Sequence, residues 1–168
     1  AQEVPRNLKA LVEQGVIFNA CSLQQLRMFG EQFPGHTVTV RINPGRGSGH
    51  SNRTNVGGPA ASFGIWHEYV DEVLAIAQEH DLTINSMHTH IGSGSDPEVW
   101  ERVALMSLEI CSRFPNATTL SLGGGYKVGR MQGEGATDLQ QIGPHVVEAF
   151  SMFEGQYGRR LTLEVEPG

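Results

Sequence analysis

The chain has 168 residues and a formal net charge of -6. This length can fill one sizeable core, the scattered basic residues argue against a nucleic-acid partner, and no apolar run approaches the roughly 18 residues of a membrane span. No signal peptide is visible, and Cys21 and Cys111 lie far apart in apolar contexts, so we expect reduced, buried thiols in a cytoplasmic protein.

Hydrophobic periodicity divides the chain into alternating helices and strands. In chain order the patterns predict a helix at 5–14, a strand at 16–21, a helix at 23–33, a strand at 37–43, a helix at 66–80, a strand from 84, a helix at 97–114, a strand at 118–122, a helix at 138–153 and a strand at 161–166. Ser22 with Gln25 predicts a capping box, and Asp96 and Asp138 are expected N-caps. Residues 44–63, rich in Gly, Ser, Asn and Pro, predict a long functional or mobile loop.

This alternation predicts an α/β fold whose strands are joined by parallel crossovers. Two architectures fit, an open doubly wound sheet or about five eighths of a (β/α)₈ barrel, since a whole barrel takes about 250 residues. Barrels place their chemistry at the carboxyl ends of the strands. Those ends carry Asn43, the segment from His90 to Ser93, the segment Gly123–Gly125, and Glu166. This recurrence predicts an active site at that rim.

Two glycine-rich segments follow predicted strands. Gly92, Ser93 and Gly94 precede a helix N-terminus, and Gly123–Gly125 follows the next strand. Glycine lets backbone N–H groups approach an anion closely, and a helix N-terminus favours phosphate. We therefore expect a shared phosphate site, although the spacing G-x-G-x-x-G of a dinucleotide fingerprint is absent.

Two histidines stand at the end of the central strand. Strict alternation would place Ile84, Ser86, His88 and His90 on one face. The H-x-H pair fits a metal site, which would need further ligands from other strand ends. The alternative is that one imidazole is packed and hydrogen-bonded inside the protein.

Glu164 and Glu166 share a face of the last strand, with leucine and valine on the opposite face. A carboxylate on a buried strand is costly unless it is paired. We expect both to point into the barrel, where they could form an ion pair with Arg41 or hold a cationic cofactor nitrogen. These two interpretations are compatible.

The motifs together resemble a known family. His-Thr-His-Ile-Gly-Ser-Gly at 88–94, Leu-Gly-Gly-Gly-Tyr at 122–126 and Glu-Val-Glu-Pro-Gly at 164–168 resemble the pyridoxal-phosphate decarboxylases with an alanine-racemase-like barrel, which act on diaminopimelate, ornithine or arginine. Residues 18–22, 40–45 and 57–65 are also similar to that family. Residues 41–45 and 123–128 are most similar to the diaminopimelate decarboxylases.

The resemblance implies roles for particular residues. His90 would stack on the pyridine ring, while Ser93, Gly124 and Gly125 would bind the phosphate. Glu166 would pair with the pyridine nitrogen, which keeps the ring able to accept electrons when the α-carboxylate leaves as CO₂. Arg41 would lie near the cofactor, and no role carries over to His88.

The resemblance also implies what lies outside residues 1–168. The family's Schiff-base lysine lies on an upstream strand, and neither Lys9 nor Lys127 matches it. The C-terminal β-domain and the arginine after Glu-Pro-Gly are missing, and Ser62 stands where the family often has lysine. We expect one partial barrel domain that is inactive alone, from a homodimeric parent that converts meso-diaminopimelate to L-lysine.

Three alternatives remain. The parent could be an ornithine- or arginine-type decarboxylase of the same family. It could be a non-catalytic barrel homologue. It could also be a metal-dependent hydrolase that uses His88 and His90.

Overall fold

The computed structural model describes residues 4–45, 62–90 and 96–166. The elements in chain order are α1 (Leu8–Glu13), β1 (Asn19–Ala20), α2 (Leu23–Gln32), β2 (Thr37–Asn43), β3 (Ile65–Trp66), the 3-10 helix η1 (His67–Tyr69), α3 (Val70–Glu79), β4 (Thr83–His88), α4 (Pro97–Ser112), β5 (Thr119–Gly124), α5 (Leu139–Tyr157) and β6 (Thr162–Glu166). Predictions for Ser93 with its glycine-rich turn, for most of the 44–63 loop and for the final Pro-Gly lie outside the described residues.

The strands form a parallel sheet in the order β1-β2-β4-β5-β6, and the two-residue β3 pairs with β2 off this path. A doubly wound sheet reverses its strand order at a switch point, whereas a barrel adds each strand beside the previous one. The order here follows the chain without reversal. The fold is therefore a partial (β/α)₈ barrel, and the doubly wound alternative is excluded.

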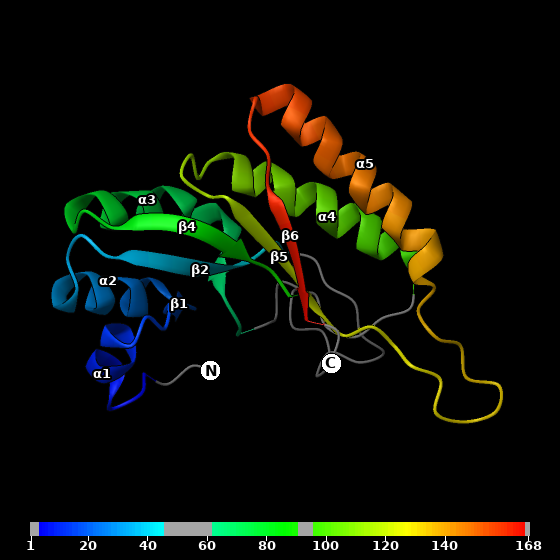
Figure 1. Cartoon of the computed structure of the whole chain (residues 1–168), viewed down its shortest axis with the longest axis horizontal. Helices are drawn as coiled ribbons and strands as arrows, with labels where there is room; N and C mark the ends of the chain where they lie inside the picture. Colours follow the sequence, from blue (N-terminus) through cyan, green and yellow to red (C-terminus); the bar gives the residue numbers. More distant parts are fainter. Residues whose placement is uncertain (1–3, 46–61, 91–95, 167–168) are drawn as a thin grey trace.

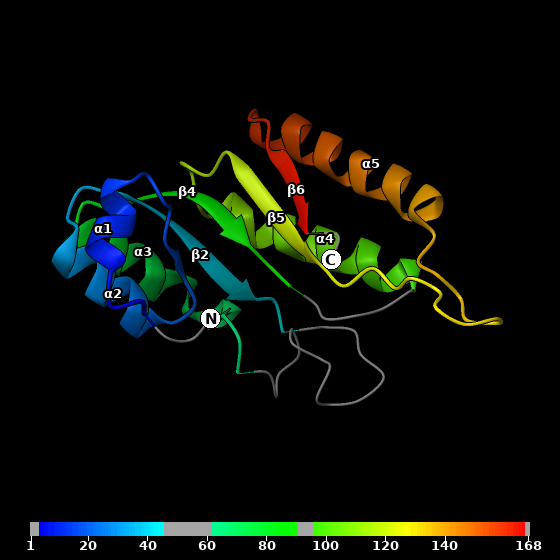
Figure 2. The ribbon, with the colours of Figure 1, turned by 60° about the horizontal axis from the view of Figure 1, so that its bottom comes forward.

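The helices cover one side of this curved sheet. α2 packs against α3, and α4 packs against α5, as Figures 1 and 2 show. The core between helices and strands contains fully buried side chains from both layers, the largest being Trp100, Phe29, Phe114, Leu26, Ile42, Ile76, Met87 and Leu120. None of the described helices is long and apolar enough to cross a membrane.

Side-chain caps explain where three helices begin. The Ser22 hydroxyl accepts a hydrogen bond from Gln25 N–H at 3.1 Å, and the Gln25 side chain accepts one from Cys21 N–H at 2.7 Å. The carboxylates of Asp96 and Asp138 accept from backbone N–H groups in the first turns of α4 and α5. All three predicted caps are confirmed, because each side chain satisfies N–H groups that a helix leaves unpaired.

The element boundaries differ from the prediction most clearly in the first part of the chain. The strand expected at 16–21 is only Asn19–Ala20, and the first helix begins at Leu8 without a side-chain cap. The helix expected at 66–80 begins later, because Ile65 and Trp66 pair with the end of β2 as β3. Cys111 is buried as expected, whereas Cys21 is half-buried, and both thiols are free.

A β-bulge in β4 overturns the predicted alternation of its side chains. Val38 on β2 faces Ile84, but the next residue, Thr39, faces Ser86. Asn85 is the extra residue, so everything after it is shifted to the opposite face. Ile84 therefore does not share a face with Ser86 and His88, which is why Met87 is fully buried in the core.

Candidate functional site

The carboxyl ends of four neighbouring strands meet at one rim of the sheet. Figure 1 shows the arrowheads of β2, β4, β5 and β6 directed toward the same region. The register places Arg41 of β2 beside His88 of β4, and Gly124 of β5 beside Glu166 of β6. The structure thus brings the described rim residues together as expected, while Ser93 lies outside the described part.

One polar contact at this rim joins His88 to Glu166. Nε2 of His88 lies 3.2 Å from Oε1 of Glu166, and the histidine side chain is 9% exposed against 55% for the carboxylate side chain. The contact is not a hydrogen bond as it stands, and neither ring nitrogen of His88 has a hydrogen-bond partner among the described residues. The family resemblance assigned His88 no role, and only the H-x-H pattern singled it out, as a candidate metal ligand.

His88 is held in its neutral form. Burial, followed by the nearby Arg41 charge, lowers the pKa of His88 from 6.5 to about 4. Burial lowers the pKa of Arg41 as well, although nearby Cys21 and Glu166 oppose this effect, and an arginine side chain stays charged in proteins. The rim therefore combines one neutral imidazole with a fixed cation and a carboxylate.

The expected ion pair between Arg41 and the glutamates is absent from the described residues, where Glu166 instead contacts the neutral His88 imidazole. The Arg41 guanidinium instead lies 5.3 Å from the centroid of the Phe63 ring. Glutamates on β6 also lie at an open sheet edge, where every residue of the strand is exposed. Water can therefore hydrate these carboxylates, which need less ion pairing than a buried carboxylate would.

His90 is fixed by the glycine-rich end of β5. The N–H of Gly124 donates to Nδ1 of His90 at 3.2 Å, so Nδ1 carries the lone pair and the neutral ring carries its proton on Nε2. Burial and then the Arg41 charge lower the pKa of His90, while Glu166 partly offsets them. The rings of His88 and His90 are 6.3 Å apart and inclined by 28°.

The glycines at this end of β5 allow close backbone approach. A Cβ on Gly124 would lie 1.6 Å from the backbone oxygen of Glu166, and one on Gly123 would lie 2.5 Å from Nδ1 of His90. Gly123 and Gly125 have φ values of 68° and 95°, which L-residues with side chains rarely adopt. The phosphate contacts expected of Gly124 and Gly125 stay predictions, and the Gly124 N–H is here bonded to His90.

The predicted metal interpretation has some geometric support. One donor atom each from His88, His90 and Glu166 lie within 4.8 Å of one another. Ligand atoms around a tetrahedral zinc with bonds of about 2.1 Å would lie roughly 3.4 Å apart. The three side chains would have to close around an ion before they could bind it.

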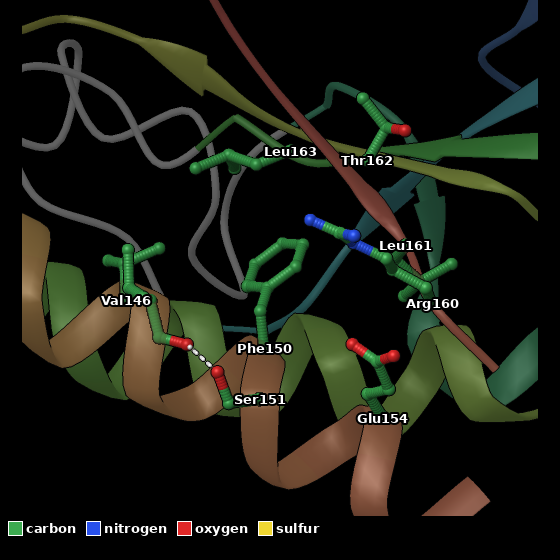
Figure 3. Close-up of a pocket in the computed structure, with 9 residues that line it drawn as sticks. Val146, Phe150, Ser151, Glu154, Arg160, Leu161, Thr162 and Leu163 are labelled. Carbon is green, nitrogen blue, oxygen red and sulfur yellow. Dashed lines mark hydrogen bonds between the residues drawn. The ribbon is translucent and has the colours of Figure 1, made fainter. Parts of the chain in front are cut away.

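The site is distinct from a hollow of about 390 Å³ between α5 and β6. Figure 3 shows Phe150 reaching from α5 toward Leu163 on β6, with Arg160 and Leu161 on the strand side. This hollow lies on the flank of the sheet beside its last strand. It contains none of the residues that the rim brings together.

Comparison with known proteins gives this rim its context. A family model described as "Pyridoxal-dependent decarboxylase, pyridoxal binding domain" matches residues 3–168. The chain is 38% identical over 162 residues to a diaminopimelate decarboxylase of Streptomyces coelicolor and 35% identical over 162 residues to that of Escherichia coli K12, covering 96% of this chain in each case. A solved diaminopimelate decarboxylase superimposes with a TM-score of 0.90 at 34% identity and covers 100% of this chain.

The chain spans 37% and 39% of the length of these two relatives, and 40% of the solved chain. The match nevertheless covers almost all of the sequence and includes the three strand-end motifs at 88–94, 122–126 and 164–168. The chain therefore belongs to the family of pyridoxal-dependent decarboxylases and matches the model of its pyridoxal-binding domain.

Proposed function

We propose that this chain is the barrel part of a cytoplasmic, pyridoxal-phosphate-dependent amino-acid decarboxylase that converts meso-diaminopimelate to L-lysine. The observation that carries the proposal is the meeting of Glu166, His90 and the Gly123–Gly125 segment at one rim. The names of the relatives at 35–38% identity support diaminopimelate over ornithine or arginine as the substrate.

The residues present fit the cofactor chemically. Glu166 offers a half-exposed carboxylate for a cationic ring nitrogen, and His90 offers a flat ring fixed through its Nδ1. Neither of the neighbouring imidazoles competes as a cation, because burial lowers the pKa of both. The fixed positive charge of Arg41 suits a site that also receives a phosphate or a carboxylate.

The proposed mechanism gives each residue a defined task. When bound, pyridoxal phosphate supplies an electron sink for the electrons left behind as the α-carboxylate departs. Glu166 holds a proton on the ring nitrogen and thereby keeps the sink effective. His90 orients the ring by stacking, and Ser93 with Gly124 and Gly125 binds the phosphate.

The remaining parts of the enzyme would come from outside residues 1–168. The chain spans about 40% of its relatives, and neither of its two lysines lies among the strand-end residues that form the rim. We propose that the full-length protein supplies the cofactor-linked lysine and a second domain. We further propose that it is a homodimer.

The first test is an absorption spectrum of the full-length protein before and after borohydride. We expect a visible band that borohydride abolishes, and CO₂ release that is faster from meso-diaminopimelate than from ornithine or arginine. Glu166→Gln should lower kcat by about 10- to 100-fold, because a hydrogen bond to a charged group is lost. A colourless protein that gains no band with added pyridoxal phosphate would contradict the proposal.

A further inference from the structure

The His88 imidazole is an unused polar group inside the candidate site. The whole residue is 7% exposed, and both ring nitrogens are buried without a hydrogen-bond partner among the described residues. A buried donor or acceptor without a partner is costly, so such a group in a folded protein calls for an explanation. The nearest charged partner that the structure shows is Oε1 of Glu166, 3.2 Å from Nε2.

The geometry points to His88 as the positioning residue of Glu166: its Nε2–H donates to one carboxylate oxygen and leaves the other free for the cationic nitrogen of the cofactor. The distance is already that of a hydrogen bond. The contact is not yet a hydrogen bond, and the half-exposed Glu166 side chain has room to turn toward the imidazole N–H. This role rests on the proposed function, because it concerns how Glu166 meets the cofactor.

The charge state of His88 suits this role. An imidazolium beside Glu166 would neutralise the carboxylate that has to hold a cationic nitrogen. Burial and the adjacent Arg41 instead keep the ring neutral. A neutral N–H donor orients the carboxylate and leaves its full negative charge available.

The sheet holds His88 in a fixed position. The bulge at Asn85 turns His88 toward the rim. Its strand neighbours Arg41 and Ser121 lie in register on either side. A donor on a central strand is less mobile than the carboxylate on the edge strand β6, so the histidine can fix the orientation of the carboxylate.

Three variants of the full-length protein separate this role from a merely structural one. Gln places its amide nitrogen where the Nε2 of His88 lies, Asn places it closer to the Nδ1 position, and Leu has no donor. We expect His88→Leu and His88→Asn to weaken pyridoxal-phosphate affinity and lower kcat by about 10- to 100-fold with little change in KM. His88→Gln should stay within about threefold of the wild type in pyridoxal-phosphate affinity and in kcat.

A second measurement does not depend on activity. Histidine ¹⁵N spectra of the cofactor-free wild-type protein should show the Nε2–H tautomer for His88, because a lone pair facing a carboxylate would be repelled. The Nδ1–H tautomer would overturn the proposal. So would Gln, Asn and Leu variants that are equally impaired, or equally unaffected.

The outcomes also distinguish this inference from the proposed function. If the wild-type protein binds no pyridoxal phosphate, the proposed function fails. If it binds the cofactor and the three variants do not divide as expected, only the role of His88 fails. Stoichiometric zinc that is lost in all three variants would show a metal ligand instead and would also overturn the role.

Discussion

At the scale of single residues, the rim is governed by how burial changes the charge of its imidazoles. His88 and His90 stand next to Arg41 and face the Glu166 carboxylate. Burial lowers the pKa of both rings in spite of the nearby carboxylate, so both rings are neutral near pH 7. Their types and positions could be predicted from the sequence. Their contacts could not, because the partner of each imidazole is set by strand register.

The buried His88 should make folding stability depend on pH. Unfolded histidine titrates near 6.5 and folded His88 near 4, so between these values the unfolded state binds the extra proton. Stability contributed by neutral His88 is therefore present above pH 6.5 and is lost as pH falls toward 4, by about 3 kcal/mol in total.

The comparison of wild type with His88→Gln measures this effect. Urea unfolding at pH 7.5 and 4.5 should show a smaller acid-induced loss of stability in the variant. Both proteins keep His90, whose pKa is also lowered, so the acid-induced loss of stability that it causes is common to the two. An identical loss in the two proteins would show that His88 is not buried in neutral form.

At the scale of elements, the starts of the three side-chain-capped helices were predictable, and strand details were not. Ser22, Asp96 and Asp138 carry their capping chemistry in the local sequence, and β2 has the expected bounds of 37–43. The Asn85 bulge and the two-residue β3 depend on which strand lies alongside. No periodicity within one segment contains that information.

Two glycine substitutions should have opposite effects on stability, because Gly124 lies where β5 and β6 are in close contact and Gly155 has open space around it. Gly124→Ala would place a Cβ 1.6 Å from a Glu166 backbone atom. It should therefore push β6 away, with a loss of about 3 kcal/mol of stability and of cofactor binding. Gly155→Ala, in α5 with open space around it, should stabilise by about 0.4 to 1 kcal/mol.

Thermal unfolding of both variants with circular dichroism checks this pair. The Gly155 variant controls for the general effect of adding a methyl group. A Gly124→Ala protein as stable as the wild type would mean that the backbones of β5 and β6 are not in close contact.

At the scale of the whole molecule, the described sheet ends at β6 with an unpaired edge. Leu163 and Val165 on that strand are 39% and 44% exposed, and Val147 and Met152 on α5 are both 64% exposed. The hollow beside Phe150 lies along the same flank (Figure 3). Apolar strand edges of this kind favour association between chains.

The 168-residue chain expressed alone should therefore self-associate. Leu163→Lys places a charge on the exposed edge and should shift the chain toward monomer in sedimentation velocity runs. Leu105→Lys is the matched control, because Leu105 is 47% exposed and belongs to α4 rather than to the edge strand. A wild-type chain that stays monomeric as its concentration rises would contradict this expectation.

The strand order also determines the order in which parts of the sheet can form during synthesis. A ribosome delivers β2, β4, β5 and β6 in the order in which they lie side by side, so each emerging strand finds its neighbour already in place. His88 is present about 78 residues before Glu166, the last described residue of the rim. A nascent chain halted between them would have formed most of the sheet and still lack the carboxylate on which the site depends.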